Sequence, residues 1–266
     1  MSSPSILAII NQKGGVGKTT TVINLAASLS IMGQNNLVID LDPQGNATTG
    51  FGKSNSDDEK NVYNLLIKKI NIENIIQKTD VQNLDLIGSH VNLSGLEVET
   101  ANDANRAFVL KEILNLKKDK ALKKYDNIFI DCPPSLSLLT IMALVASDEL
   151  LVPLQTEFFA LEGLTQLMKT IDRIKSNLNS SLEIRGILLT MYDKRNKLSG
   201  QVEEEARNYF NEKVYSTVVP RNVRLSEAPS HGVPVLLYDK VCPGSKAYFN
   251  FTDEFLNQDK PIESAA

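Results

Sequence analysis

The chain has 266 residues, of which 42% are hydrophobic and 23% are charged, and these proportions exclude a disordered or fibrous protein. Its two cysteines, Cys132 and Cys242, suit a reducing compartment and exclude both a disulfide framework and a four-cysteine metal site. The 28 basic and 32 acidic residues give a net charge of −4, which over the whole chain argues against a nucleic-acid-binding protein.

The predicted elements alternate along the chain between strands and helices. Apolar runs predict strands at residues 7–12, 37–41, 84–87, 127–131, 149–153, 183–191 and 214–219. Helices are expected after the glycine-rich turn at 13–17 and near 62–69, 106–116, 135–146, 161–176, 199–210 and 245–256. Composition predicts an exposed loop at about 45–60 and an irregular passage, rich in proline and glycine, at 222–234.

This alternation implies β-α-β units, and therefore a mostly parallel twisted sheet with helices on both faces. We expect a single α/β domain over residues 1–266, with a short tail at 1–4 and a flexible tail at about 258–266. The start lacks a basic signal-peptide region, and the apolar stretch Leu138–Ala146 is too short to cross a bilayer. We therefore expect a cytoplasmic protein.

The strongest motif is Lys13-Gly14-Gly15-Val16-Gly17-Lys18-Thr19, between a predicted strand and a predicted helix. Glycines allow backbone N–H groups to turn inward around a polyphosphate, and the helix N-terminus adds a partial positive charge. In such a loop the second lysine reaches the β- and γ-phosphates, and the threonine hydroxyl binds Mg²⁺. The generic loop has glycine where this chain has Gln12, and it lacks the first lysine.

Three acidic residues lie at predicted strand ends. Asp40 and Asp42 are two residues apart, so on one strand both carboxylates face the same side of the sheet. Asp131 closes another apolar strand, where it is suited to holding a Mg²⁺-bound water. Because α/β sheets bind ligands at the carboxyl ends of their strands, these acids favour a catalytic site over turn-forming roles.

Five blocks of sequence together resemble the ParA/Soj chromosome-partitioning (or plasmid-partitioning) ATPases, which are P-loop NTPases with a deviant Walker A motif. The blocks are NQKGGVGKTTT at 11–21, DLDPQGNAT at 40–48, DCPPS at 131–135, LTMYD at 189–193 and VPRNVRLSEAPSHGVPV at 219–235. The resemblance extends from about residue 7 to 256. Gln12 is usual in that family, so the departure from the generic loop supports the match.

The resemblance implies a Mg²⁺-dependent ATP hydrolase that dimerises with ATP sandwiched between two copies. Lys13 is then expected to reach the partner's phosphates, Asp42 to position or activate the attacking water, and Asp40 and Asp131 to hold Mg²⁺ through water. Pro220 and Asn222 match positions that flank the adenine. The implied ATP-binding residues are Lys13, Gly14, Gly15, Val16, Gly17, Lys18, Thr19, Thr20, Pro220 and Asn222.

The resemblance further implies non-specific binding of double-stranded DNA by the ATP-bound homodimer, and nucleoid association. Arg195 and Arg224 match the positions of the DNA-binding arginines, and Arg221 lies close enough in sequence to contribute. A ParB-like centromere-binding partner is expected to stimulate slow hydrolysis and so release the DNA. From the residues alone, an ordinary solvated face with charge pairs is the favoured interpretation of these arginines, and the resemblance reverses it.

Three other functional classes remain as alternatives. A MinD-like membrane-cycling regulator needs a basic amphipathic C-terminal helix, but residues 251–266 hold four acidic residues and one lysine. An iron–sulfur ATPase needs two suitably placed cysteines, which Cys132 and Cys242 do not provide. A cargo-positioning ATPase differs from a DNA-segregation ATPase only in its cargo. No extra operator-binding domain is expected, because Lys13 lies so close to the start.

The other conspicuous side chains are interpreted as structural. Cys132 follows a buried strand and is expected to be an inert thiol, while His90 and His231 lack a second ligand at metal-binding spacing. An aromatic stripe at helical spacing is expected to belong to the core; it consists of Tyr248, Phe251 and Phe255.

Overall fold

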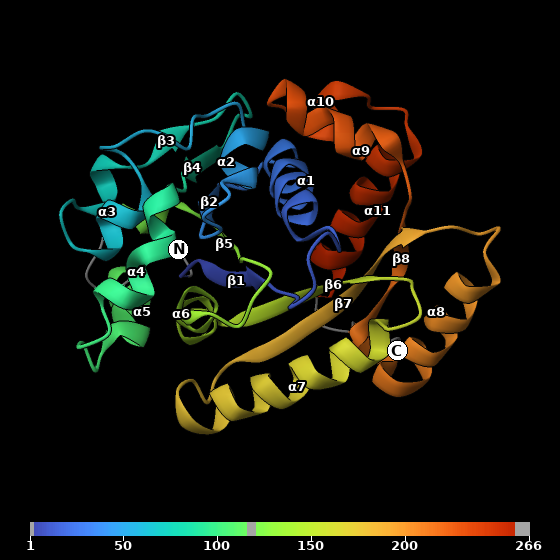
Figure 1. Cartoon of the computed structure of the whole chain (residues 1–266). Coiled ribbons are helices and arrows are strands. Elements are labelled where there is room, and N and C mark those ends of the chain that lie inside the picture. The colour runs from blue at the N-terminus through green and yellow to red at the C-terminus, as the bar shows by residue number, and fades with distance from the viewer. Residues whose placement is uncertain (1–2, 116–120, 259–266) are drawn as a thin grey trace, which may run out of the picture.

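The computed structural model describes residues 3–115 and 121–258. Within them eight strands form one sheet, in the order β3-β4-β2-β5-β1-β6-β7-β8 (Figure 1). The pairs are parallel, except that β3 runs antiparallel to β4. The strands are β1 Ser5–Ile9, β2 Asn36–Asp40, β3 Gln77–Lys78, β4 Leu84–Ile87, β5 Asn127–Asp131, β6 Glu149–Gln155, β7 Glu183–Tyr192 and β8 Val214–Pro220.

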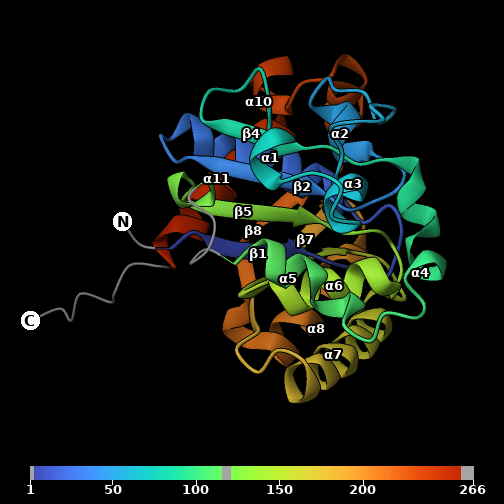
Figure 2. The ribbon, with the colours of Figure 1, turned by 90° about the vertical axis from the view of Figure 1, so that its left-hand side faces the viewer.

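Helices cover both faces of the sheet, as Figure 2 shows. One face packs against α1 Lys18–Ile31, α2 Asn46–Gly50, α9 Val223–Glu227, α10 Val235–Tyr238 and α11 Pro243–Asn257. The other packs against α3 Val62–Leu66, α4 Leu96–Glu99, α5 Val109–Ile113, α6 Leu138–Ala146, α7 Ala160–Asn177 and α8 Lys197–Phe210. Short 3₁₀ turns connect these elements: η1 Ile72–Asn74, η2 Val91–Gly95, η3 Arg106–Phe108, η4 Leu122–Lys124, η5 Asn211–Lys213 and η6 Ala228–His231.

Alternation along the central strands divides the hydrophobic core between the two faces. On β1, Leu7 and Ile9 face α1, whereas Ile6 and Ala8 face the opposite layer with α6. All four side chains are at most 5% exposed. A strand buried on both faces needs a continuous apolar run rather than an alternating one, which is the pattern these strands show.

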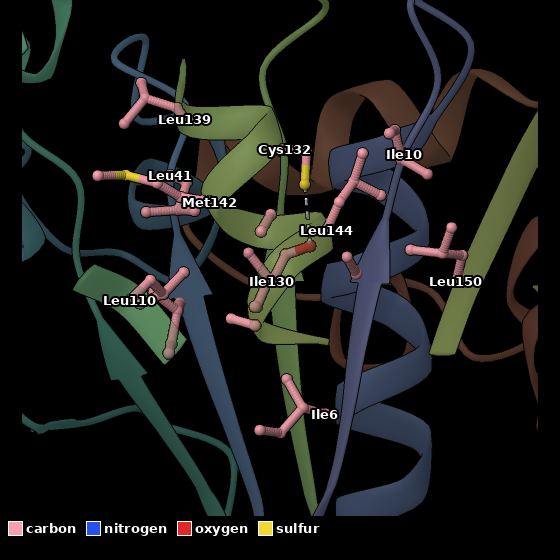
Figure 3. Packing of buried hydrophobic residues seen from close by; sticks show 14 of the residues in the cluster. Ile6, Ile10, Leu41, Leu110, Ile130, Cys132, Leu139, Met142, Leu144 and Leu150 are labelled. Atoms are coloured by element: carbon pink, nitrogen blue, oxygen red, sulfur yellow. Dashed lines mark hydrogen bonds between the residues drawn. The ribbon is translucent and has the colours of Figure 1, made fainter. Parts of the chain in front are cut away.

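Figure 3 shows one of the two layers at close range. Ile130 of β5 lies among Ile6, Met142 and Leu144, so α6 is seated over the centre of the sheet. Cys132 follows the same strand and is 1% exposed. Burial, and to a smaller extent the charge of Asp131, raises the pKa of its thiol. The expectation of an inert, buried cysteine therefore agrees with the structure.

The predicted strands agree with the structure to within a few residues, while several short elements depart from prediction. The expected loop at 45–60 contains α2, and the passage at 222–234 holds α9 and η6. The strand β3 was not predicted at all, because two residues carry no periodicity. The expected tails at 1–4 and 258–266 lie mostly outside the described residues. No helix in the described ranges is long and apolar enough to span a membrane.

Candidate functional site

The glycine-rich loop connects β1 to α1 at the carboxyl edge of the sheet, between the ends of β5 and β6. Gly15 and Gly17 have φ values of +76° and +92°, a region that side chains with a Cβ rarely adopt. The loop is held in place from β7, because the Thr190 hydroxyl donates to the Val16 carbonyl at 2.8 Å. The loop is therefore fixed by tertiary contacts as well as by its glycines.

Lys18 occupies the first turn of α1 and is 6% exposed. Its ammonium donates to the Lys13 carbonyl oxygen at 3.0 Å, so the side chain folds back over the loop. Burial lowers the pKa of Lys18, and the negative charge of Asp131 partly opposes this shift. A buried cation inside a ring of backbone N–H groups is a strong site for a polyanion.

Two of the predicted acids lie side by side at the sheet edge, because β2 and β5 pair Asp40 with Asp131. Asp40 accepts hydrogen bonds from the backbone and hydroxyl of Thr48 at 2.8 and 2.7 Å, and from the backbone of Asp42. Burial nevertheless raises the pKa of Asp40 to about 6. β2 ends at Asp40, so Asp42 lies on the following loop and not on the strand as predicted.

Asp131 is fully buried, and among the described residues neither of its carboxylate oxygens has a hydrogen-bond partner of ordinary geometry, although the Thr19 hydroxyl lies close enough to lower its pKa. Burial and the charge of Asp40 together raise the pKa of Asp131 well above its usual range. A buried carboxylate whose hydrogen bonds are this poorly satisfied, beside a second acid and a buried lysine, is the environment of a group that pairs with a hydrated cation.

These residues fit Mg²⁺ held largely through water. Thr19 lines the same cavity as Lys18 and Asp42, so its hydroxyl is available as a direct ligand beside bound phosphates. Among the described residues, no three histidine, cysteine or acidic side chains converge as a ready metal site.

Two adjoining cavities extend from the loop. The larger, of about 520 Å³, is lined by Gly14, Gly15, Gly17, Lys18, Thr19, Thr20 and Asp42, together with Met191, Leu225 and Pro229. A smaller one, of about 120 Å³, shares Gly17, Thr20 and Met191 with it and is lined by Pro220, Asn222 and Tyr248. A polar, cationic cavity that continues into a more apolar one suits a phosphate chain with an attached ring.

Lys13, the additional lysine of the loop, lies half exposed at the rim and forms an ion pair with Glu157, which follows β6. Sequence reasoning did not predict this partner. The available signal was that Glu157 lies two positions beyond a strand that ends at the same edge of the sheet. Met191 and Leu225 were likewise missed as cavity residues, because apolar side chains near strand ends look like core.

The three arginines predicted to bind DNA lie at the carboxyl ends of β7 and β8. The backbone N–H of Arg221 donates to the Tyr192 carbonyl at 3.1 Å, which brings the two segments together. Arg195 pairs with Asp193 at 2.9 Å, and Arg224 pairs with Glu227 at 2.7 Å. Arg221 is exposed and has no ion pair to any residue in the described ranges.

The residues interpreted as structural have structural contacts. His90 is buried and lies 3.2 Å from Asp58, and His231 stacks on Tyr238. Phe251 and Phe255 lie on α11, and their side chains are buried in the core. Tyr248 is buried too, but it also borders the smaller cavity and hydrogen-bonds Thr21 of α1 at 3.0 Å.

Comparison with known proteins gives consistent matches. The family model that matches residues 4–184 is described as an AAA domain. The chain is 48% identical to the chromosome partitioning protein ParA of Caulobacter vibrioides, over 98% of this chain and 97% of that protein. It is 47% identical to the chromosome-partitioning ATPase Soj of Treponema pallidum, over 95% and 97% of the two chains.

A solved structure is similar over the same length. It is the cobyrinic acid a,c-diamide synthase from Mycobacterium smegmatis with bound ATP analogue and magnesium, which is 32% identical with a TM-score of 0.82. The match covers 96% of this chain and 95% of that one. The predicted P-loop fold is thus confirmed by the sheet and by this likeness.

Proposed function

Because the chain belongs to the ParA/Soj family of chromosome-partitioning ATPases, we propose that it segregates DNA through a cycle of ATP binding, dimerisation and hydrolysis. It is an ATP hydrolase whose cofactors are ATP and Mg²⁺. The observation that carries the proposal is the buried Lys18 beside Asp131, a carboxylate whose hydrogen bonds are poorly satisfied, under a glycine-rich loop.

Within the site, Lys18 binds the β- and γ-phosphates, and the backbone from Gly14 to Thr20 surrounds them. Thr19 would bind Mg²⁺ directly, Asp40 and Asp131 would hold it through water, and the ion would neutralise charge on the phosphates during transfer. Asp42 orients the attacking water and accepts its proton. Its backbone is well placed for this, because the loop that carries it is fixed to Asp40 at 3.1 Å.

At the other end of the nucleotide, Pro220 and Asn222 flank the adenine in the smaller cavity. Lys13 acts across the dimer interface, where it contacts the partner's phosphates. Water is excluded between the two copies, so a positive charge placed there stabilises the transition state more than it could in solvent.

The ATP-bound dimer binds double-stranded DNA of any sequence through Arg195, Arg221 and Arg224, and this binding associates it with the nucleoid. A ParB-like protein stimulates hydrolysis, and the dimer then separates and releases the DNA. The adjacency of the β7 and β8 ends supports this assignment, since it gathers the three arginines on one edge.

The test measures ATP hydrolysis and DNA binding together. Purified protein is applied to immobilised duplexes of two unrelated sequences at low salt, with ATP, with ADP, or without nucleotide. We expect equal binding to both duplexes that requires ATP. Lys18→Ala serves as the nucleotide-binding control and should bind neither ATP nor DNA. Wild-type protein that hydrolyses ATP yet ignores DNA would contradict the proposed cargo.

A further inference from the structure

The ion pair between Lys13 and Glu157 lies within one chain. The proposed cycle requires the same lysine to contact phosphates bound by a second copy. An ammonium group has three N–H donors, but binding both anions would bring the Glu157 carboxylate against the phosphates, and these negative charges repel each other. The intramolecular pair therefore competes with contact across the interface.

The backbone on both sides of this pair is fixed. The N–H of Lys13 donates to the Asn11 side chain at 3.0 Å, and its carbonyl accepts from Lys18. On the other side, the N–H of Glu157 donates to the Gln155 carbonyl at 2.9 Å, and the Glu157 carbonyl accepts from the N–H of Ala160, the first residue of α7. Exchange of partners therefore needs only side-chain rotation.

The segment that carries Glu157 faces solvent at the rim of the site. Phe158 and Phe159, the next two residues, are 74% and 65% exposed, with ring centroids 5.0 Å apart. The side chains of Lys13 and Glu157 are themselves 50% and 30% exposed. A second copy can therefore approach the pair without any rearrangement of the core.

We propose that Glu157 is a positioning residue that holds Lys13 in the monomer and thereby raises the protein concentration needed for ATP-dependent dimerisation. This inference rests on the proposed function, because it takes Lys13 to act in the dimer. Bound ATP places a larger negative charge in the partner's site than one carboxylate offers, so Lys13 exchanges Glu157 for phosphate only when both sites are loaded.

The size of the effect follows from the exposure of the pair. A partly exposed ion pair changes an equilibrium by about 1.5- to 5-fold. A symmetric dimer breaks two such pairs, so removing Glu157's charge should lower the dimer dissociation constant by about 2- to 30-fold.

The experiment compares Glu157→Gln with Glu162→Gln, an exposed glutamate one turn along α7 that has no described ion pair. Both changes are made in full-length Asp42→Ala protein, so that ATP is not consumed, and dimerisation with MgATP is measured by sedimentation over a concentration series. Glu157→Gln should dimerise more tightly within the range above, and Glu162→Gln should match its parent. Unchanged dimerisation of Glu157→Gln would overturn the proposal. Weaker dimerisation would also overturn it, because the carboxylate would then stabilise the dimer across the interface.

A second measurement keeps this inference separable from the proposed function. In nucleotide-free protein, the rate at which an amine-reactive acylating reagent labels Lys13 is followed by mass spectrometry. Lys13 should be labelled about 1.5- to 5-fold faster in Glu157→Gln than in Glu162→Gln. Equal rates in the two variants would show that the ion pair does not form in solution. If Glu157→Gln accelerated labelling as expected but the protein did not dimerise with ATP, the ion pair would be supported and the proposed function would be contradicted.

Discussion

At the scale of single residues, the carboxyl groups of Asp40 and Asp131 lie together but differ in their partners. Both are fully buried, adjacent across paired strands, and raised in pKa. Asp40 accepts hydrogen bonds from Thr48 and the Asp42 backbone, whereas Asp131 has only the Thr19 hydroxyl and the charge of Lys18 beside it. A metal ion and its waters would supply what Asp131 lacks.

The first prediction concerns the pH dependence of stability in nucleotide-free protein. The pKa of Asp40 rises from 3.8 to about 6 on folding, so this group stabilises the fold below pH 4 and that contribution is lost as pH rises through 6. The loss is about 3 kcal/mol. The pKa of Asp131 is raised as well, by burial and then by the charge of Asp40, so its ionisation costs stability in the same direction. Asp131→Asn removes that cost and should gain in Tm over wild type, by several degrees, as pH rises from 4 to 7.

The measurement is thermal unfolding without nucleotide or Mg²⁺ across that pH range. Asp172→Asn, an exposed acid on α7, is the matched control and should follow wild type at every pH. If Asp131→Asn were less stable than wild type at pH 7, the carboxylate would be a structural group and its metal role would be wrong.

A second prediction separates nucleotide binding from chemistry. Lys18→Ala leaves phosphates without a buried cation and should weaken ATP binding by about 30-fold or more. Asp42→Ala should keep ATP affinity but lower the hydrolysis rate by about 100-fold or more, because it removes the group that handles the attacking water. Titration with a fluorescent ATP analogue measures the ATP affinity, and phosphate-release kinetics measure the hydrolysis rate. Equal loss of ATP binding in both variants would contradict this division of roles.

At the scale of elements, strand pairing decides which side chains can act together. The parallel register of β7 and β8 places Tyr192 opposite Pro220, and the segments that follow carry the three arginines. Two of these, Arg195 and Arg224, already pair with acids on their own segments. Their charge is partly neutralised before any ligand arrives.

The third prediction follows from that difference. Arg221→Ala should weaken DNA binding by the ATP-bound dimer more than Arg195→Ala or Arg224→Ala does singly, because Arg221 has no competing ion pair within the described residues. The ATP affinity of each variant is measured alongside, because Arg221 also lines the smaller cavity. Arg173→Ala, on the exposed side of α7, is the control. Filter binding or fluorescence anisotropy measures the DNA affinity of each variant. Loss of affinity in Arg224→Ala alone would contradict the prediction.

Short elements show where sequence patterns lose their predictive value. The helix α2 covers only Asn46–Gly50, inside a stretch whose composition suggests a loop. It is anchored from outside, since Asp40 accepts two hydrogen bonds from Thr48. A carboxylate eight residues away supplies the missing stability, and no local propensity could reveal it.

At the scale of the whole molecule, a net charge of −4 coexists with an arginine-bearing edge. DNA would meet that edge alone, while the acidic remainder disfavours binding elsewhere on the surface. Two copies side by side double the number of phosphate contacts, which makes affinity depend strongly on dimerisation.

The fourth prediction is a salt dependence. Three arginines on each of two copies would neutralise about six phosphates, so log affinity should fall with log salt at a slope of about −5. Binding titrations with MgATP at several salt concentrations measure it, and Arg221→Ala should reduce the slope by about 2 for the dimer. A slope near zero would exclude this edge as the DNA surface.

The sequence by itself determined every described strand except β3, and also the loop at 13–19 and its position between β1 and α1. Central parallel strands are buried on both faces, so their apolar runs are legible without tertiary information. Lys18, Thr19 and Asp131 were found in the same way, because a phosphate loop and strand-end acids are local patterns.

Only the tertiary structure decided what those residues contact. Asp131 has no well-formed hydrogen bond and Arg221 no ion pair among the described residues, and Lys13 pairs with Glu157. Each of these facts depends on strands β5 to β8 ending at one edge of the sheet. Charge interactions act through space, over distances set by packing, so sequence separation carries no information about them.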